Sequence, residues 1–581
     1  MRRLLDLEEE QIQLGKDVLG DNGNLCSQPS LVLDMVADMF VREYRAAAVT
    51  IVEQLSRMSS PKELILGIEG RLAELKCSRE ADTDESDDES DDRERREGKD
   101  SKTLQSEAAV CALATYVRAY GTSLKRLVTT KQDLFYSSAF DAISSTFTHL
   151  VVDGALEREF RSPIDLILIE AIFELASQVE SIEKEGQRQS ARVKARALVE
   201  TVVGLSTSAF RSSYANDFFL SLHPKYRMSE ATSLSLENRA RQTPHIVRAS
   251  QTKHIWTDVF PTLYKNLDYQ LDDLLVDCRY SDALKQIGSF SFLSHFLALN
   301  PATPISAFDI DEDMQATPSF LLSAVLGTIQ SSYGPFSPYK LAEDDILFFL
   351  WWCVDQQTKS EEEMAAGFEA DAMFELVHVL TLLSAASPNP QTRFLAFRLL
   401  STLVLDHTGA SPGSDSVQMP LLKNLLTHIG TPATKTACLE IVKEVLARKL
   451  DESEKDPDFV SLFLTPDFIE EFGPIILRGV PPDIFKTLSP DTFLAQFERD
   501  VSQKLNLYYF LLTRDKENKT GIRSTSTLQD TKEQFLDPLK KQLSSWLDPT
   551  KTEKLNPSVS LELELVQSSL SRIDELLKAL A

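Results

Sequence analysis

The chain has 581 residues, more than one ordinary domain holds, and 43% of them are hydrophobic, enough to form a large core. The small number of glycines, 20, argues against Gly-rich nucleotide-binding folds and all-β barrels. The formal net charge of −27 argues against nucleic-acid and anionic-membrane partners, because neutralising phosphates requires an excess of Lys and Arg.

Residues 1–76 carry apolar side chains at helical spacing and predict a set of N-terminal helices. The start of the chain turns acidic within two helical turns and lacks the apolar region of a signal peptide. The six cysteines are scattered without a CxxC pair, so we expect reduced thiols rather than disulfides or a zinc site. The longest apolar run, residues 346–354, is about half a membrane span. These features predict a soluble protein of the cytoplasm or nucleus.

An acidic segment interrupts the helices at residues 77–106. Between Glu80 and Asp100 the sequence has twelve acidic and four basic residues and no large apolar side chain. Such a segment cannot bury enough surface to offset the conformational entropy that folding costs. The sequence therefore predicts a disordered acidic insertion that is dispensable for folding.

Residues 107–253 again show helical spacing and end in a locally basic stretch, 223–253. Its six basic residues, against Glu230 and Glu237, are Lys225, Arg227, Arg239, Arg241, Arg248 and Lys253. We interpret 107–253 as N-terminal helical repeats followed by a basic connector between two helical halves. Docking of an acidic partner, or of the acidic insertion itself, on this connector is the alternative.

Residues 254–581 contain a repeat with an offset of 42 residues. The segment Pro390-Gln-Thr-Arg-Phe-Leu-Ala-Phe-Arg-Leu-Leu400 is followed by Pro432-Ala-Thr-Lys-Thr-Ala-Cys-Leu-Glu-Ile-Val442. Each copy begins with a Pro suited to the first turn of a helix and continues with an apolar stripe. A period of this size is typical of HEAT and armadillo units. Because no segment shows a convincing strand pattern, we predict an all-α, HEAT/armadillo-like α-solenoid of stacked helix pairs.

Residues 346–354, with the sequence ILFFLWWCV, are apolar on every side of a helix. Asp344 and Asp345 precede them and are good helix-capping residues. This pattern predicts a central helix that is buried in the core. An exposed aromatic binding surface is the alternative.

No motif in the chain predicts catalysis. Residues 409–413 match the pattern GxSxG, but no strand is predicted before them and Pro412 lacks the N–H that an oxyanion hole requires. The acidic run at 309–313 begins like a calcium loop but has Met314 and Phe320 where Gly and Glu are required. Zinc, phosphate-loop and dinucleotide motifs are absent from the sequence. We therefore expect no enzymatic activity, no cofactor, no metal and no small-molecule substrate.

The C-terminal segment 489–581 predicts three helices. A Ser-Pro pair at 489–490 starts the first, whose apolar residues across 493–512 recur at steps of three and four and form one continuous face. Its end is apolar on the other sides too, so we expect it to be covered all round, by neighbouring helices or by a partner. Basic residues and Gly521 suit its C-terminal end. An Asp-Pro pair at 537–538 starts the second helix, and the third has a seam at Leu563, Val566, Leu570, Ile573, Leu577 and Leu580.

The run Leu507-Tyr-Tyr-Phe-Leu-Leu-Thr-Arg-Asp-Lys-Glu-Asn-Lys-Thr-Gly-Ile522 resembles the C-terminal signature of the glomulin family. Phe535-Leu-x-Pro-Leu539 and the Leu-rich final helix follow in the order found in that family. Arg393-Phe-x-x-Phe-Arg-Leu-Leu400 also resembles its HEAT-like repeats. The family includes the plant aberrant lateral root formation protein and fungal Yap-binding proteins. The specific resemblance covers the last third of the chain.

The resemblance implies a non-enzymatic helical protein whose C-terminal region, within 254–581, binds the RING subunit of cullin–RING ubiquitin ligases. It also implies that binding blocks access of the ubiquitin-conjugating enzyme. The candidate contact residues are Tyr508, Tyr509, Arg514, Lys516, Asn518 and Arg523. A core position is the alternative for Tyr508, and helix capping is the alternative for Arg514 and Asn518. Two other functions stay open: a Yap-type transcription-factor-binding stress regulator, and a generic HEAT-repeat adaptor or transport scaffold.

Overall fold

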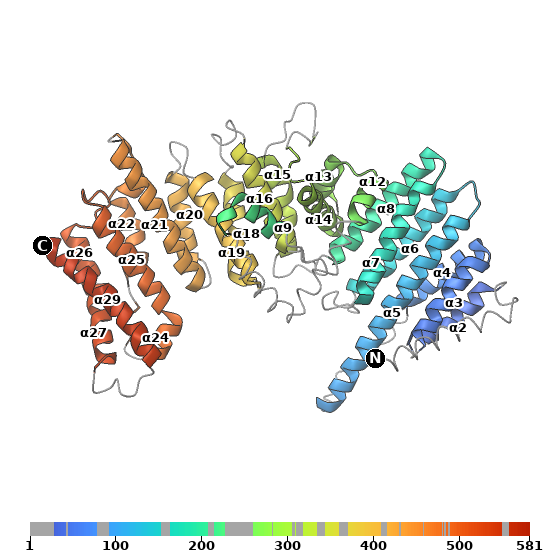
Figure 1. Ribbon diagram of the computed structural model, residues 1–581, viewed down its shortest axis with the longest axis horizontal. Helices are drawn as coiled ribbons and strands as arrows, with labels where there is room; N and C mark the ends of the chain where they lie inside the picture. Colours follow the sequence, from blue (N-terminus) through green and yellow to red (C-terminus); the bar gives the residue numbers. More distant parts are fainter. Residues whose placement is uncertain are drawn as a thin grey trace. The chain divides into compact units, whose positions relative to one another are not determined.

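The residues that the computed structural model describes form helices joined by turns and loops (Figure 1). These are 28–41, 44–77, 92–152, 163–206, 214–226, 259–281, 283–304, 308, 318–333, 343–359, 370–387, 389–407, 415–428, 432–456, 458–478, 480–481, 484–485, 488–548 and 557–580. Within them no strand occurs, so the predicted all-α class is confirmed. The chain divides into two compact units, Met1–Cys353 (unit 1) and Val354–Ala581 (unit 2), with the boundary inside α16 (Glu343–Lys359).

Unit 1 is built from two layers of helices packed face to face. One layer contains α3 (Arg45–Met58), α5 (Asp92–Arg126) and α7 (Pro163–Ser177). The other contains α4 (Pro61–Cys77), α6 (Gln132–Val152), α8 (Glu185–Ser206) and α14 (Ala283–Leu299). The remaining elements are α2 (Pro29–Val41), η3 (Gln178–Ser181), α9 (Tyr214–Leu222), η5 (Pro224–Tyr226), α12 (Phe260–Asn266), α13 (Leu271–Tyr280) and α15 (Pro318–Tyr333). Successive helices thus stack as pairs, as expected for an α-solenoid.

Unit 2 consists of stacked helices and several short segments. Its α-helices are α18 (Ala370–Ala386), α19 (Pro390–Thr402), α20 (Asp415–His428), α21 (Pro432–Lys455), α22 (Asp467–Ile476), α24 (Pro490–Gln496), α25 (Glu498–Arg514), α26 (Thr525–Thr531), α27 (Asp537–Trp546) and α29 (Pro557–Leu580). Its other segments are the π-helical η8 (Leu403–His407) and η10 (Lys532–Leu536) and the 3-10 turn η9 (Leu462–Leu464). α21 packs against α20 and α25, and α25 packs against α29.

The predicted 42-residue repeat corresponds to α19 and α21. Both helices begin at the proline of the repeat, which suits the first turn because proline has no N–H to lose there. The equivalent residues Leu399 and Ile441 are buried, as are Leu400 and Val442. The repeat therefore reproduces both a helix start and the face that packs into the core, and the HEAT/armadillo-like solenoid class is confirmed.

The acidic insertion differs in part from the expectation. α5 begins at Asp92, so residues 92–106 of the range expected to be disordered are helical. Arg, Glu and Lys, which are frequent there, favour helix, and extending an existing helix costs far less than starting a new one. Residues 78–91 of the insertion lie outside the described residues, as do residues 227–253 of the basic connector and the motifs at 409–413 and 309–313.

The prediction of a buried helix at 346–354 is confirmed in α16. Every side chain from 346 to 354 is almost inaccessible to solvent, including Trp351 and Trp352. Just before this run, buried Asp345 lies 3.1 Å from Nε2 of His295 in α14. The run therefore forms core and is not an exposed aromatic binding surface.

α8 and α14 approach each other more closely than most side chains would allow. A Cβ atom placed on Gly288 of α14 would lie only 1.9 Å from the carbonyl oxygen of Glu200 in α8. The Glu200 side chain is itself buried, with Oε2 3.8 Å from Nζ of Lys285. Burial raises the pKa of this carboxyl to about 8, despite the opposing effect of Lys285.

The C-terminal helix starting at Ser489 is broken rather than continuous. Ser489 caps α24 by accepting a hydrogen bond from the Thr492 N–H at 3.2 Å, as its position predicts. Phe497 then leaves the helical conformation, with φ −121° and ψ −23°, and α25 begins at Glu498. The regular apolar spacing concealed this break because the residues on both sides still face the core.

Two structural absences bear on function. None of the helices in the described ranges is both long and apolar enough to cross a membrane. Within the same ranges, His, Cys, Asp and Glu side chains form no group that could hold a metal ion. Cys111, Cys278, Cys353 and Cys438 are free thiols, and burial raises the pKa of Cys438 to about 12.

Candidate protein-binding site

The loop after α25, residues 515–524, is organised around the buried carboxylate of Asp515. Its Oδ1 accepts a hydrogen bond from the Lys519 N–H at 2.8 Å. Its Oδ2 accepts hydrogen bonds from the N–H of Thr520 at 2.9 Å and from the Thr520 hydroxyl at 2.7 Å. A buried carboxylate satisfied by several donors holds a loop in one conformation. The loop is therefore a fixed surface feature.

Asn518 and Arg523 are part of this internal network. Asn518 has a left-handed backbone, φ 56°, and its Oδ1 accepts a hydrogen bond from the Arg523 N–H at 2.7 Å. The Arg523 guanidinium donates hydrogen bonds to the carbonyl oxygens of Leu512 at 2.6 Å and Lys516 at 3.2 Å. It thereby satisfies a carbonyl at the end of α25 that has no partner within the helix. Arg523 therefore acts at the end of α25, whereas the Asn518 side chain holds the loop together.

Tyr508 lies in the core of unit 2. Its side chain is inaccessible to solvent, and burial raises the pKa of its hydroxyl well above the ordinary value. Of the six candidate contact residues, Tyr508 is thus the one whose side chain does not reach the surface. Its place on the regular apolar stripe already suggested this alternative.

Tyr509 and Arg514 emerge on opposite sides of α25. Tyr509 is half-buried, and the guanidinium of Arg572 in α29 lies over its ring, 4.8 Å from the centroid. Arg514 pairs with Asp451 of α21 and lies 3.8 Å from Glu454. Phe510 is also half-exposed, so neighbouring helices leave part of the end of α25 open, and a partner is the remaining way to cover it.

Lys516 extends from the fixed loop into solvent. Its side chain is exposed and makes no ion pair or hydrogen bond within the part of the chain that the structure describes. Its backbone carbonyl, in contrast, is held by Arg523 at 3.2 Å. A fixed backbone with an unpaired ammonium group suits contact with an acidic group on a partner.

The sequence did not reveal a second exposed element, on α29. The buried seam of this helix contains Leu563, Val566, Leu570 and Ile573, while Leu577 is half-exposed and Leu580 is 38% exposed. On another face, Leu561 and Leu565 are 59% and 62% exposed. They lie one helical turn apart, and Arg572 continues the same face two turns further on. The signal was present in the sequence as leucines outside the seam.

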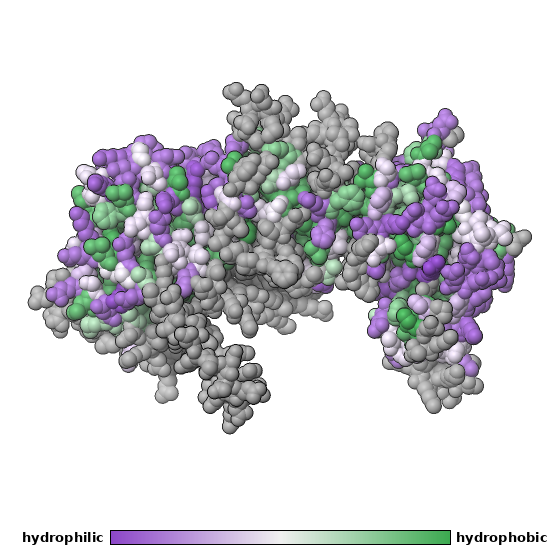
Figure 2. Space-filling view, turned by 180° about the vertical axis from the view of Figure 1, so that it is seen from behind, coloured by the Kyte–Doolittle hydropathy of each residue, from purple (hydrophilic) through white to green (hydrophobic). Residues whose placement is uncertain are grey.

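We give the name α25–α29 surface to five side chains: half-buried Tyr509 of α25, exposed Lys516 of the loop that follows it, and exposed Leu561, Leu565 and Arg572 of α29. It combines apolar anchors, an aromatic ring and basic groups. On the face of the molecule in Figure 2, hydrophobic residues likewise form small areas between hydrophilic ones rather than one continuous patch. Mixed surfaces of this kind are typical of partners that associate and dissociate.

Comparison with known proteins places this surface inside a family region. Residues 314–574 match a family model described as an uncharacterised protein family, YAP/Alf4/glomulin. No curated protein matches the chain. The matched region contains the 515–524 loop and the exposed residues of α29, whereas most of unit 1 precedes it. The C-terminal part of this chain is therefore similar to the YAP/Alf4/glomulin family.

Proposed function

We propose that the chain binds the RING subunit of cullin–RING ubiquitin ligases through the α25–α29 surface. Binding there would block access of the ubiquitin-conjugating enzyme and so regulate ubiquitination. The observation that carries the proposal is the family match across 314–574, the region that also presents this surface. A helical-repeat protein of this family acts by binding protein partners, and we propose that it catalyses no reaction itself.

The proposed mechanism is steric and needs no titrating group. A stable interface of this kind buries about 1,200–2,000 Å², with a few aromatic and Arg residues supplying most of the energy. Tyr509 and Arg572 would be such anchors because each restricts the other before a partner arrives. Leu561 and Leu565 would supply apolar area, and Lys516 would pair with an acidic group.

The test measures binding of a RING subunit to the full chain and inhibition of ubiquitin-chain formation. The variant is Leu561→Glu with Leu565→Glu, which places charge on the exposed face of α29. The control is Leu66→Glu with Leu134→Glu, two leucines of unit 1 that are also about 60% exposed. We expect the variant to weaken binding about tenfold or more and the control to have little effect.

Two results would reject the proposal. If the folded variant inhibits as well as wild type, the α25–α29 surface is not the contact. If wild type binds no RING subunit, the next candidate is a Yap-type transcription factor, because the family description also names YAP. The proposed role requires a cytoplasmic or nuclear location, which a fluorescent fusion would reveal.

A further inference from the structure

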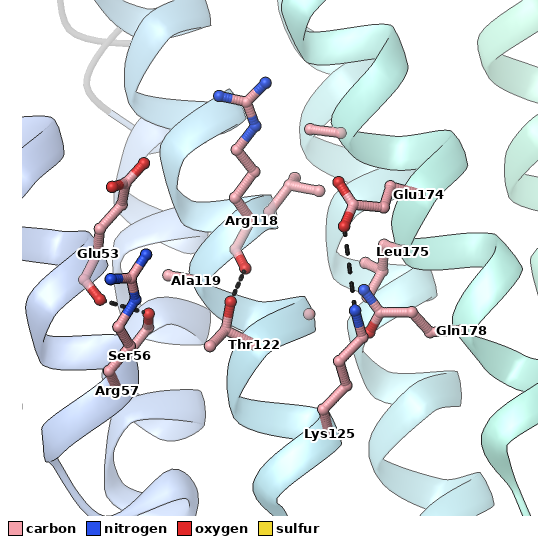
Figure 3. A pocket seen from close by; sticks show the side chains of 13 residues that line it. Glu53, Ser56, Arg57, Arg118, Ala119, Thr122, Lys125, Glu174, Leu175 and Gln178 are labelled. Atoms are coloured by element: carbon pink, nitrogen blue, oxygen red, sulfur yellow. Dashed lines mark hydrogen bonds and ion pairs between the residues drawn. The ribbon is translucent and has the colours of Figure 1, made fainter. Parts of the chain in front are cut away.

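Unit 1 contains a cleft on the surface of the layer formed by α3, α5 and α7. Its volume is about 170 Å³, and it is lined by residues from all three helices and from the adjoining η3 (Figure 3). Charged groups in the cleft come from Glu53 and Arg57 of α3, Arg118 and Lys125 of α5, and Glu174 of α7. These charged groups make the cleft polar, in contrast to the tightly packed apolar core beneath it.

The two arginines of the cleft are exposed and unpaired. Lys125 lies 4.0 Å from Glu174, but Arg57 and Arg118 make neither an ion pair nor a side-chain hydrogen bond within the described part of the chain. Every other arginine of unit 1 whose side chain is described has such a partner: Arg45, Arg71, Arg126, Arg188, Arg192 and Arg196. In a chain with a net charge of −27, unpaired arginines are the exception, and these two share one cleft.

The floor of the cleft is held in place without these arginines. The Gln178 side chain packs closely against Gly121 of α5. A Cβ atom placed on Gly121 would lie only 2.8 Å from Nε2 of Gln178. The guanidinium of Arg126 donates hydrogen bonds to the carbonyl oxygens of Ser56 and Ser59, the latter at 3.0 Å, and so joins the ends of α3 and α5. Arg57 and Arg118 are therefore available for a ligand on a scaffold that is already fixed.

We propose that this cleft binds a short acidic segment of a partner protein. Guanidinium groups recognise carboxylates through paired hydrogen bonds, and two of them in one cleft suit a segment with acidic residues spaced along it. Glu53 and Glu174 lie among the basic groups, which disfavours a dense polyanion such as RNA, as does the charge of the whole chain. The site lies before the family-matched residues and is independent of RING binding.

The experiment titrates full-length protein into fluorescent peptides and measures their anisotropy. One peptide alternates Asp and Glu with Gly and Ser, and a second replaces each acid by its amide. The double variant Arg57→Glu with Arg118→Glu is compared with a control double variant, Lys62→Glu with Lys131→Glu. These two lysines are exposed and lie outside the cleft, and both double variants change the net charge by the same amount. Circular dichroism checks that both proteins are folded.

We expect the acidic peptide to bind wild type and the lysine variant with similar affinity, and the arginine variant about tenfold or more weakly. Binding should weaken with added salt, and the amide peptide should not bind. The proposal is overturned if the acidic peptide does not bind, if both variants bind it equally, or if the amide peptide binds as well. Binding of single-stranded RNA to the cleft without binding of the acidic peptide would also overturn it.

Discussion

Arg572 of α29 lies over the ring of Tyr509 of α25, joining α29 to the helix that precedes the 515–524 loop. Each side chain limits the movement of the other, and both remain partly open to solvent. The contact therefore contributes to stability and also positions an aromatic and a basic group for a partner.

A double-mutant cycle will separate the Tyr509–Arg572 contact from the other effects of the two side chains. The cycle uses Tyr509→Leu, Arg572→Met and the combined variant, with stability measured by urea denaturation. We expect a coupling energy of about 0.5–1 kcal/mol, the usual size for a cation–π contact that is not fully buried. A coupling near zero would show that the two groups are neighbours without mutual stabilisation.

Replacing Asp515 will loosen the 515–524 loop. Asp515→Ala removes the acceptor for three hydrogen bonds, and we expect a loss of about 2–4 kcal/mol because the donors are left partly buried. Trypsin should then cut native protein after Lys516 or Lys519. Exposed Glu517 provides the control, since Glu517→Ala should change stability by about 0.5 kcal/mol or less. Unchanged melting and protease resistance in Asp515→Ala would refute a central role for this carboxylate.

Glu200 should make the stability of unit 1 depend on pH. Its pKa in the folded protein is about 8, against an ordinary value of 4.5, because it is buried between α8 and α14. Between these values the folded state keeps a proton that the unfolded state has released. The contribution of this bound proton to the free energy of unfolding is therefore complete below pH 4.5 and is lost as the pH rises through 8.

The comparison for this prediction is Glu200→Gln, which is neutral at every pH. Relative to this variant, wild type should lose about 1.4 kcal/mol of stability per pH unit across the middle of that range. The groups that act on Glu200 are Lys285, Asp277, Tyr269 and Arg196, and the variant leaves all of them unchanged. Parallel stability profiles for the two proteins would show that Glu200 does not carry the effect.

The fold could be predicted from local features of the sequence. Pro390 and Pro432 mark two helix starts, and the apolar stripes that follow them face the core, because helix period and burial act on neighbouring residues. The break at Phe497 could not be predicted, since a change of helix direction depends on packing against distant segments. The helical start of α5 was missed because composition alone did not show that a buried helix would extend into the acidic run.

The candidate site was harder to predict because it depends on how segments fold together. The apolar stripe placed Tyr508 correctly as an alternative core residue, and Tyr509 points about 100° away from it on the same helix. The hydrogen bonds of Asn518 and Arg523 depend on the conformation of the loop, and a loop conformation leaves no periodic pattern in the sequence. Arg57 and Arg118 line one cleft only because α3 and α5 pack side by side.

Gly288 should tolerate no side chain at the α8–α14 interface. In Gly288→Ala the new methyl group would lie 1.9 Å from the Glu200 carbonyl oxygen, which is backbone and cannot rotate away. The helices must therefore move apart, and we expect the free energy of unfolding to fall by about 3 kcal/mol or more, at the upper end of the cost of overpacking.

Gly327 of α15 is the matched control, because it is exposed and a Cβ there would meet no atom within 4 Å. Gly327→Ala should stabilise the protein by about 0.5–1 kcal/mol, since alanine favours helix. Thermal melting of the two variants measures both effects, and equal melting temperatures would mean that α8 and α14 are not held in close contact.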